Sequence, residues 1–284
     1  MTELRWDAEG LQQALQAQLP QLPQLPSLTV EVVARCASTN TVLIERARAG
    51  NTHPCLLLAE EQTHGRGRMG RTWQSAHAQA LGSSLTFSLA LPLAPKDWQG
   101  LSLAVGVALA TALDSTGHHI GLKWPNDLWL LDGPGRGRKL AGTLIETVAS
   151  QGQRVVVVGV GINVLPQPDA GTGPTLSSGY ACLAELNPAI TAAQAWHQVL
   201  PHLVRALLTF EASGLSTFVN AFSQRDLLCG QTVLTTQQGV EVGHCEGINE
   251  QGALLVRDRT TQVLHAIHSG EVSVRPLAVL SSVM

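Results

Sequence analysis

The sequence is short of charge, of paired cysteines and of long apolar runs. Charged residues make up only 14% of its 284 residues and the net charge is −3, so no overall positive field draws it to nucleic acid or membrane. Its five cysteines are scattered, with no C-x-x-C pair and no metal-ligand spacing to histidine, which argues against a metal site built from side chains and favours a reducing compartment. No apolar run reaches membrane-spanning length.

What the sequence has in quantity is apolar side chains. Hydrophobic residues make up 44% of the chain, which suits a compact enzyme and argues against disorder. A chain of this length is expected to form one large domain and one small one. The N-terminus carries Glu3, Asp7 and Glu9 without a long apolar segment, so we do not expect it to be a signal peptide. The predicted location is the cytoplasm.

Glycine and arginine alternate in the stretch G-R-G-R-M-G-R-T-W, residues 65–73, which we call the Gly/Arg loop. Glycine allows backbone N–H groups to approach a ligand closely. Arginine keeps its charge and offers a planar fork for carboxylate and phosphate oxygens. Arginines this close repel one another unless an anion lies between them. The loop is therefore predicted to bind an anion and to order around it, the alternatives being a solvated loop or part of a nucleic-acid surface.

The same loop matches a dinucleotide-binding fingerprint by spacing alone, Gly65-x-Gly67-x-x-Gly70. That motif needs a strand that leads directly into a helix, and an acidic residue about 20 positions later. A strand over 55–59 is predicted, but no helical apolar stripe follows the loop and no acidic residue lies near that offset. An NAD-binding site is therefore rejected.

Hydrophobic periodicity predicts strands and helices, followed by a region of short strands. The expected helices are 8–19, 38–50, 97–114, 191–211 with a break or kink at Pro201, and 215–226. The expected strands are 28–34, 55–59, 82–91 (half-buried), a strand opened by Lys139, and 155–164, and the segment 120–131 is expected to contain a turn at Pro125. From Leu228 onward five short strands, with turns at Gly239, Asn249-Glu250 and Gly270, predict a small β-barrel.

Three polar groups stand where regular elements begin, turn or are interrupted. The S-T-N trio (38–40) precedes a helix, and spacing alone favours a capping role over a ligand-binding one. K-W-P-N-D (123–127) places polar side chains around a proline that fixes a turn and aims them. The alternative is an ordinary Asn-Asp turn between two strands, with no functional role. V-V-V-V-G-V-G-I-N-V (155–164) is interrupted by two glycines and an asparagine that a purely structural strand does not need. Gly142 lies where a bulge or close backbone approach is expected.

Four motifs in this order carry a family resemblance: G-R-G-R-x-G-R-x-W (65–73), K-W-P-N-D (123–127), R-K-L-A-G-x-L-I-E (138–146) and V-V-G-V-G-I-N (157–163). S-T-N precedes them, and Q-G-A-L-L (251–255) and G-E-V-S-V-R (270–275) follow. Over about residues 28–276 the chain resembles the biotin–protein ligases (biotin–[acetyl-CoA-carboxylase] ligases). Met69 departs from the basic residue frequent at its position, and Thr143 from the commoner isoleucine.

The resemblance implies an α+β fold. The expected architecture is a mixed β-sheet with flanking helices, related to class II aminoacyl-tRNA synthetases, followed by a small C-terminal SH3-like β-barrel. The implied division is an N-terminal helix and Pro-rich extension (1–27), a biotin/ATP-binding catalytic domain (28–226) and the barrel (227–284). Residues 1–27 have no counterpart in the resemblance, so the chain resembles the non-repressor group that lacks an N-terminal winged helix domain.

The resemblance also implies the activity and its partners. Members of the family join biotin to ATP, which gives biotinoyl-5′-AMP and pyrophosphate, and then transfer biotin to a lysine of a biotin carboxyl carrier protein or domain of acetyl-CoA carboxylase or another biotin-dependent carboxylase. Mg²⁺ is expected with the ATP phosphates rather than in a cluster of side chains. No DNA and no membrane partner is expected, and the chain is expected to be a monomer or a homodimer. No general base for the attacking amine can be named.

The family's functional residues carry over position by position. The implied catalytic residues are Lys139, Arg66 and Arg68. The implied biotin-binding residues are Ser38, Thr39, Asn40, Gln62, Arg66, Gly67, Arg68, Lys139 and Gly142. The implied ATP- and adenylate-binding residues are Arg68, Arg71, Trp73, Lys123, Asn126, Asp127 and Asn163.

Three other functions compete with biotin ligation. A lipoate– or octanoate–protein ligase shares the adenylation chemistry, but its substrate has a long apolar chain and no ureido ring, so the S-T-N trio and the Gly/Arg loop favour biotin. A non-catalytic nucleotide- or biotin-binding regulator would not need Lys139 and the loop arginines intact. A DNA-binding repressor is disfavoured by the acidic net charge.

Overall fold

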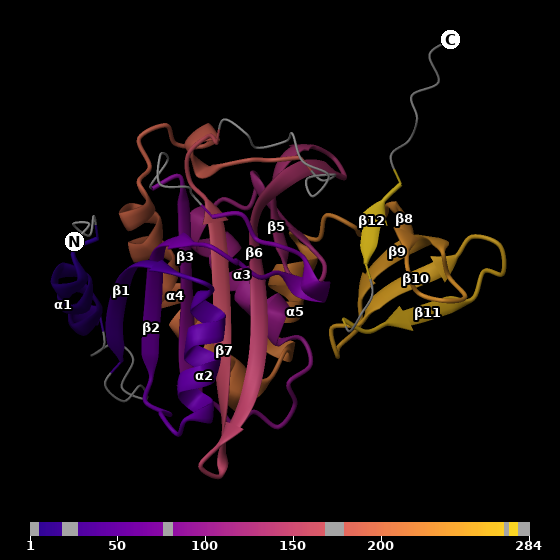
Figure 1. The fold of residues 1–284 in the computed structure, drawn as a ribbon. Helices are drawn as coiled ribbons and strands as arrows, with labels where there is room; N and C mark the ends of the chain where they lie inside the picture. Colours follow the sequence, from indigo (N-terminus) through magenta and orange to yellow (C-terminus); the bar gives the residue numbers. More distant parts are fainter. Residues whose placement is uncertain (1–5, 19–27, 76–81, 168–178, 270–272, 278–284) are drawn as a thin grey trace.

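The computed structural model describes residues 6–18, 28–75, 82–167, 179–269 and 273–277, and a seven-stranded sheet lies at its centre (Figure 1). The strand order is β1-β2-β3-β7-β6-β5-β4. β1 runs parallel to β2 and every other neighbouring pair is antiparallel, so the predicted mixed sheet is confirmed. The strands are β1 (Thr29–Cys36), β2 (Cys55–Gln62), β3 (Ser84–Pro92), β4 (Ile120–Lys123), β5 (Asp127–Gly133), β6 (Arg136–Ser150) and β7 (Gln153–Asn163).

Helices cover both faces of this sheet (Figure 1). They are α1 (Ala8–Gln18), α2 (Thr39–Arg48), α3 (Leu101–Leu113), α4 (Ala192–Ser213) and α5 (Ser216–Ser223). α4 begins at a capping box in which Thr191 and Gln194 exchange hydrogen bonds, and it continues through Pro201. Of the expected break or kink at Pro201, the break is therefore wrong. α5 ends earlier than predicted, because the backbone of 225–227 instead pairs with Leu122 of β4.

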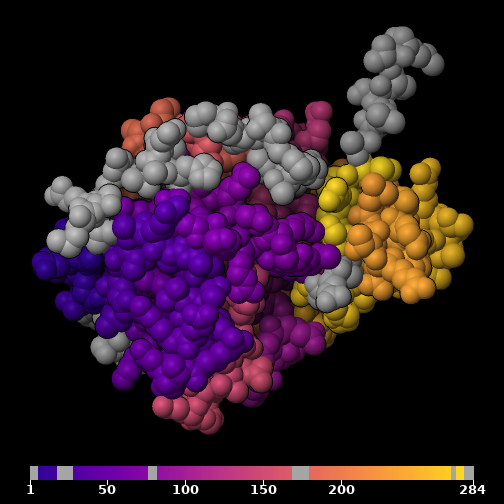
Figure 2. Space-filling model, in the orientation of Figure 1, coloured from indigo at the N-terminus to yellow at the C-terminus, as the bar shows by residue number. Residues whose placement is uncertain are grey.

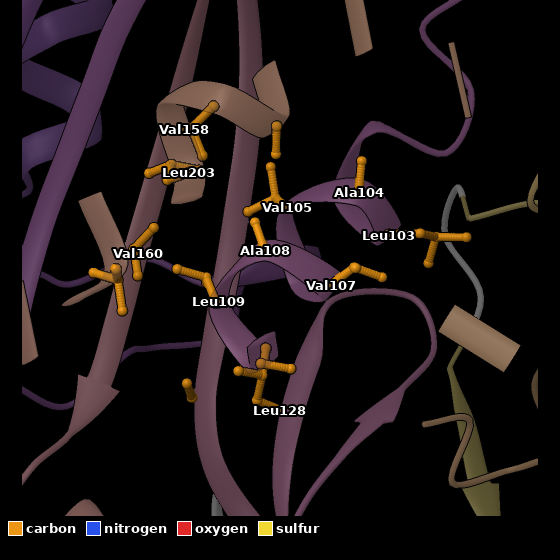
Figure 3. Close-up of a cluster of buried hydrophobic side chains, with 14 of the residues drawn as sticks. Leu103, Ala104, Val105, Val107, Ala108, Leu109, Leu128, Val158, Val160 and Leu203 are labelled. Atoms are coloured by element: carbon orange, nitrogen blue, oxygen red, sulfur yellow. The ribbon is translucent and has the colours of Figure 1, made fainter. Parts of the chain in front are cut away.

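The main core lies between the sheet and the layer formed by α3 and α4. Figure 3 shows Val105 and Leu109 of α3 among Val158 and Val160 of β7 and Leu203 of α4. Each such side chain is buried, and full burial of a side chain of this kind stabilises the fold by about 1.5–3 kcal/mol. This layer holds the sheet rigid, so the opposite face can carry polar groups.

Strand β3 departs from its prediction. The alternation of the sequence places Leu85, Phe87 and Leu89 in the core, as expected. Thr86 and Ser88, on the other face, are also buried, so the predicted half-buried strand is wrong. The reason is tertiary: α2 packs over this face of β3 at Ser88, and the Trp73 ring lies against Gly161, the cross-strand partner of Thr86. No local pattern reports such covering groups.

Helix α1 protects the outer strand of the sheet. Leu11 and Leu15 point into the core, and the Gln12 side chain donates to the Leu28 carbonyl and accepts from the Val30 N–H. An uncovered edge strand would offer these backbone groups to another chain. The predicted helix is confirmed over Ala8–Gln18, while the proline-rich stretch that follows lies outside the described residues.

A second sheet of five strands forms a separate lobe beside the first (Figures 1 and 2). Its order is β11-β10-β9-β8-β12, and all neighbours are antiparallel. The strands are β8 (Thr232–Thr235), β9 (Val242–Ile248), β10 (Leu254–Asp258), β11 (Leu264–Ile267) and β12 (Val274–Pro276). Turns occur at Gly239 and Asn249-Glu250 as predicted, and Gly270 lies outside the described residues.

The two sheets are joined by specific contacts. The Trp124 indole donates to the Gly252 carbonyl at 3.0 Å. Val233 and Leu254 of the C-terminal lobe belong to the same apolar cluster as the main core. Among the described helices, none combines the length and apolarity needed to cross a bilayer.

Candidate active site

The sheet face that carries α2 has an apolar half and a polar half. Beneath the helix, Leu43 and Ala47 of α2 pack on Leu57, Ala90 and Val157 of the sheet. Beyond the N-terminus of the helix, three cross-strand pairs of β3 and β7 form what we call the polar floor: Ser84–Asn163, Thr86–Gly161 and Ser88–Gly159. A pocket of ≈ 360 Å³ lies here, with residues of both strands in its wall.

Every residue that the resemblance implied for the site lines this one pocket. They are Ser38, Thr39, Asn40, Gln62, Arg66, Gly67, Arg68, Arg71, Trp73, Lys123, Asn126, Asp127, Lys139, Gly142 and Asn163. They come from α2, β2, the Gly/Arg loop, the β4–β5 turn, β6 and β7, which are far apart in the sequence. Their individual roles stay predictions.

The S-T-N trio does more than begin a helix. Ser38 occupies the N-cap position of α2, but its side chain makes no capping hydrogen bond. The Thr39 backbone N–H and hydroxyl lie 2.7 and 3.0 Å from Gln62 Oε1, and its hydroxyl lies 2.6 Å from Ser88 Oγ. The capping interpretation that spacing favoured is therefore not supported, because the trio's polar groups face the pocket and the polar floor.

Asn40 is fixed in one orientation. Its Nδ2 donates to the Leu144 carbonyl and to Glu146 Oε2, at 3.1 and 3.0 Å, and its Oδ1 accepts from Ser88 Oγ at 2.6 Å. The single hydroxyl proton of Ser88 is thereby used, so Thr39 must be the donor in the Thr39–Ser88 bond. The Thr39 oxygen keeps a lone pair and can accept a hydrogen bond from a ligand N–H group.

The two glycines of β7 make room for side chains of the site. A Cβ on Gly159 would lie 2.2 Å from Asn40 Oδ1, and a Cβ on Gly161 would lie 2.3 Å from the Trp73 ring. Both distances are far below van der Waals contact, so these positions require glycine. The third interruption, Asn163, donates to the Lys139 and Ala181 carbonyls at 3.3 and 2.9 Å. The three residues thus accommodate or hold neighbouring parts of the site, and their functional role stays a prediction.

A β-bulge aims Lys139 into the pocket. Leu128 pairs with Ala141 and Trp129 with Lys139, so Leu140 has no partner on β5. Leu140 and Ala141 are both fully buried in the core, while Lys139 Nζ lies 3.2 Å from where a Cβ of Gly142 would be. A bulge redirects side chains in this way. At Gly142 it is side chains, those of Lys139 and Asp127, that approach closely, and the bulge itself lies at Leu140.

Positive charge gathers at the other end of the pocket, which we call the cationic end: Arg68, Arg71, Lys123, Lys139 and Arg275. Asp127 is the one acidic side chain among the described residues that line the pocket, and its Oδ1 lies 2.8 Å from Lys139 Nζ. Five cations around one carboxylate leave an excess of positive charge, which an anionic ligand would neutralise.

Lys123 is the most perturbed of these cations. Burial lowers the pKa of its ammonium group to about 8, opposed by Asp127 and reinforced by Lys139, Arg71 and Arg275. Its Nζ lies 5.4 Å from the centroid of the Trp129 ring. Burial also lowers the pKa of Arg68, although Asp127 opposes the shift. The polarity of this end therefore suits a ligand that brings its own negative charge.

The Gly/Arg loop is a tight hairpin anchored at both sides of the pocket. Gly67 N donates to Arg71 O at 2.7 Å and Trp73 N to Gly65 O at 2.9 Å. Arg68 donates to the Ser269 carbonyl, and Arg71 donates to Ser273 Oγ at 3.3 Å. The C-terminal lobe thus contacts the loop directly.

Several lining residues were missed by the sequence analysis. Thr86 could have been found, because a buried strand rarely carries hydroxyls without a use. The same signal marks Ser88, which does not line the pocket but bonds to Thr39 and Asn40, which do. Ser273 and Arg275 lie in a motif that carried the resemblance, yet nothing in its spacing linked them to the pocket. Tyr180 also lines the pocket, and its hydroxyl donates to the Leu165 carbonyl; no local signal marked it.

Metal-binding side chains do not cluster in the described ranges, where no group of three histidine, cysteine or acidic residues could hold an ion. Asp127 and Asn126 offer oxygen atoms at the cationic end. They suit a magnesium ion that is bound mainly by the ligand's own oxygens rather than by a cage of protein ligands.

Comparison with known proteins places this pocket in a family. Residues 32–163 match the model of the biotin/lipoate A/B protein ligase family. The chain is 33% identical over 252 residues to a bifunctional ligase/repressor BirA of Salmonella typhimurium, covering 87% of this chain and 74% of that protein. It is 30% identical over 232 residues to a biotin–[acetyl-CoA-carboxylase] ligase of Paracoccus denitrificans, covering 80% and 93%.

The fold matches as well as the sequence. A solved structure of a biotin protein ligase from Aquifex aeolicus in complex with biotin and ATP superposes with a TM-score of 0.70 and 26% identity, covering 87% of this chain and 99% of that one. The similarity therefore extends over both sheets rather than over the seven-stranded sheet alone.

Proposed function

Because the chain belongs to the biotin/lipoate A/B protein ligase family, we propose that its pocket binds biotin over the polar floor and ATP at the cationic end. The chain is an ATP-dependent biotin–protein ligase, which activates biotin to biotinoyl-5′-AMP with release of pyrophosphate and transfers it to a lysine of a biotin carboxyl carrier protein. The observation that carries the residue assignments is that Lys139 faces the same pocket as the S-T-N trio, so one lysine can reach the carboxylate of a ligand whose ring lies on the floor.

The ring end of the pocket suits a ureido group. Biotin's ring carries two N–H donors and one carbonyl acceptor. Thr39 keeps a lone pair for an N–H group, as the proton count above requires. The Ser38 hydroxyl lines the pocket without a capping bond and is available to donate to the carbonyl. An alkyl chain would leave the Ser38 hydroxyl without this partner, and an unpaired buried polar group costs about 1–3 kcal/mol.

The cationic end suits the reaction. A carboxylate oxygen of biotin attacks the α-phosphorus of ATP, the bond to the bridging oxygen of the β-phosphate breaks, and pyrophosphate leaves with the electron pair. Two anions must meet, so the site has to neutralise charge where the bond forms. Lys139 suits the position between carboxylate and phosphate, since its ammonium is a compact charge with three donors. Arg68 and Arg71 would cover the mixed anhydride and keep water from it.

Mg²⁺ is proposed to enter with the nucleotide. Bound to the phosphate oxygens, it would supply charge neutralisation on the leaving pyrophosphate. Asp127 would face it, held in place by Lys139 at 2.8 Å. Asn126 is fixed by its donation to the Thr143 carbonyl at 2.7 Å, and its Oδ1 accepts from Arg68 Nη1 at 3.4 Å, so this oxygen would reach the nucleotide through its second lone pair or beside Arg68.

Binding of the nucleotide is expected to depend on pH through Lys123. Its pKa of about 8 means that the amine loses its charge as the pH rises above that value. Polyphosphate favours the charged form, so at pH 8 binding takes up about half a proton, and the affinity falls by up to about tenfold per pH unit above it. Calorimetry with a non-hydrolysable ATP analogue measures the affinity at each pH. Repeating it in buffers of different ionisation enthalpy gives the number of protons taken up.

Two variants make this result specific. Lys123→Arg keeps its charge at every pH tested, so its affinity should stay constant up to pH 9. Lys123→Met should bind the ATP analogue more weakly than the unmodified protein does at pH 8 and below. Its side chain at position 123 cannot be protonated, so binding should take up no proton there. Equal proton uptake by Lys123→Met and the unmodified protein would show that Lys123 is not the group protonated when the nucleotide binds.

Arg68→Ala is expected to let the intermediate escape. Hydrogen bonds to a charged group contribute about 1.5–3 kcal/mol, so the dissociation rate of biotinoyl-adenylate should rise by about 10- to 100-fold. The measurement is release of preformed radiolabelled adenylate into an excess of unlabelled adenylate. Arg257→Ala, which removes an exposed arginine of the C-terminal lobe paired with Glu246, is the control and should release adenylate at the normal rate. Unchanged release by Arg68→Ala would contradict the covering role.

The function is tested by ATP–pyrophosphate exchange with biotin, lipoate and octanoate side by side. Exchange should depend on biotin and should be at least about 100-fold slower with the two other acids, because neither carries the ureido donors and acceptor that the trio would pair. Exchange that is faster with lipoate or octanoate would establish the alternative ligase. Nucleotide binding without exchange for any acid would establish the non-catalytic regulator.

The finer architecture is also a proposal. The five-stranded sheet would close as an SH3-like barrel over residues 227–284, after a catalytic domain over 28–226 and an N-terminal extension over 1–27. The contacts of Arg68 and Arg71 with Ser269 and Ser273 support a role of this lobe in bracing the loop. The carrier would be the biotin carboxyl carrier domain of acetyl-CoA carboxylase or another carboxylase. A cytoplasmic monomer or homodimer without a DNA partner stays a prediction.

A further inference from the structure

Glu146 lies where two parts of the site meet. Its Oε1 and Oε2 accept from both terminal nitrogens of Arg66, at 2.9 and 3.1 Å, in a bidentate pair. The same Oε2 accepts from Asn40 Nδ2 at 3.0 Å. One carboxylate on β6 therefore binds the first arginine of the Gly/Arg loop and the first turn of α2 at once.

These bonds close a continuous polar circuit around the pocket. It runs from Arg66 through Glu146, Asn40, Ser88 and Thr39 to Gln62, whose Oε1 accepts from the Thr39 backbone N–H. Gln62 is the last residue of β2 and leads directly into the loop that carries Arg66. The backbone N–H of Gln62 donates to Ser75 Oγ, and that hydroxyl donates back to the Gln62 carbonyl. Both stems of the loop are thus connected to the polar floor.

The geometry gives Arg66 a different task from the other loop arginines. Both terminal nitrogens of its guanidinium donate to Glu146, whereas Arg68 and Arg71 belong to the cationic end of the pocket. The pair is half-exposed, with 47% of the Arg66 side chain and 26% of the Glu146 side chain accessible. A plain surface pair of this exposure would stabilise little, but two parallel N–H···O bonds fix the relative orientation of the elements they join.

We propose that Glu146 is a positioning residue of the ligase, which ties the Gly/Arg loop to the ring-binding residues through Arg66 and Asn40 and so retains the adenylate. Arg66 acts through this pair rather than as a ligand of the anhydride. The inference rests on the proposed function of the pocket. It assigns to Glu146 a role that neither the motif spacing nor the predicted set of site residues included.

The test is a double-mutant cycle on adenylate retention. Glu146→Gln keeps an oxygen for Asn40 but removes the charge that holds Arg66, and Arg66→Gln removes the opposite partner. Each should raise the dissociation rate of preformed biotinoyl-adenylate by about tenfold, and the double variant by no more than about twofold beyond the larger single effect, because the pair acts as a unit. If the fold-increase in dissociation rate of the double variant were instead the product of the two single increases, the proposal would be overturned.

A second readout separates positioning from general loss of structure. Arg66→Gln leaves the bond between Glu146 and Asn40, so its dissociation constant for biotin alone should stay within about twofold of normal, whereas Glu146→Ala should raise it by about fivefold or more. Glu246→Gln breaks another Arg–Glu pair, in the C-terminal lobe, and should change neither quantity. Equal biotin affinities for Arg66→Gln and Glu146→Ala would overturn the proposed link to Asn40.

A third readout needs no substrate. Trypsin cleaves after Arg68 and Arg71, and in Glu146→Gln this cleavage should become at least about fivefold faster, since the loop has lost an anchor. Cleavage at the normal rate would overturn the anchoring role even if the protein is a biotin ligase. If instead the unmodified protein showed no biotin-dependent exchange, the proposed function would fail, while the trypsin result would still decide whether Glu146 holds the loop.

Discussion

Lys139→Ala is expected to abolish adenylate formation while the fold stays intact. Lys139 Nζ is the cation that lies between the Asp127 carboxylate and the Trp73 ring, 2.8 Å from Asp127 Oδ1 and 5.9 Å from the ring centroid. Removing one preorganised donor from a developing anion slows catalysis by about 10²–10³-fold. Here the same ammonium also offsets the repulsion between biotin's carboxylate and the α-phosphate, so we expect a loss of at least about 10³-fold.

The measurement is biotin-dependent ATP–pyrophosphate exchange, together with thermal unfolding. The substitution leaves the backbone bonds of Lys139 with Gly179 and Ala181 in place, so the melting temperature should change little. Lys96→Ala, at an exposed position outside the pocket, is the matched control and should exchange normally. Normal pyrophosphate release by Lys139→Ala would show that another group bridges the two anions.

Gly159→Ala is expected to destroy ring recognition without affecting the nucleotide. The added methyl group would lie 2.2 Å from Asn40 Oδ1, so the amide must leave its place. Asn40 then loses its bonds to Ser88, Leu144 and Glu146. At about 1 kcal/mol for each net hydrogen bond, the dissociation constant for biotin should rise by about 100-fold, while that for an ATP analogue should stay within about twofold.

The matched control is Gly159→Ala in a protein that already lacks the Asn40 amide with which the new methyl group collides. In an Asn40→Ala background the new methyl group meets no amide, so Gly159→Ala should weaken biotin binding by no more than about twofold further. The measurement is the dissociation constant for biotin, obtained by calorimetry on the unmodified protein, the two single variants and the double variant. If Gly159→Ala bound biotin normally, or if its effect were equally large without Asn40, the steric explanation would be wrong.

Much of the fold was readable from the sequence because its patterns are local. The alternation of Leu85, Phe87 and Leu89 marks a strand face directed at the core. The turns at Gly239 and Asn249-Glu250 divide the C-terminal lobe into its strands. The site residues were readable for a different reason, since four motifs in order carried a resemblance from which each position could be transferred.

What the sequence did not show depends on elements that meet only in the folded chain. The bulge at Leu140 arises where β5 and β6 fall out of register, and the letters R-K-L-A-G do not reveal which residue is skipped. The burial of Ser88 comes from a covering helix. The pairing of Arg66 with Glu146 joins positions 80 apart in the chain, and no local pattern links an arginine in a glycine-rich loop to one carboxylate on a distant strand.

The sheet face that α2 covers only in part determines what size of substrate the pocket can accept. The point at which α2 begins sets how much of the polar floor a ligand can occupy, since the strands beneath run on beyond the start of that helix (Figure 1). An added or removed turn at the start of this ten-residue helix would make the pocket shallower or deeper without altering the strand that presents Lys139. Molecular size and chemical reaction are thus governed by separate parts of the scaffold, and loop-proximal helix ends tolerate such changes in length better than packed strands do.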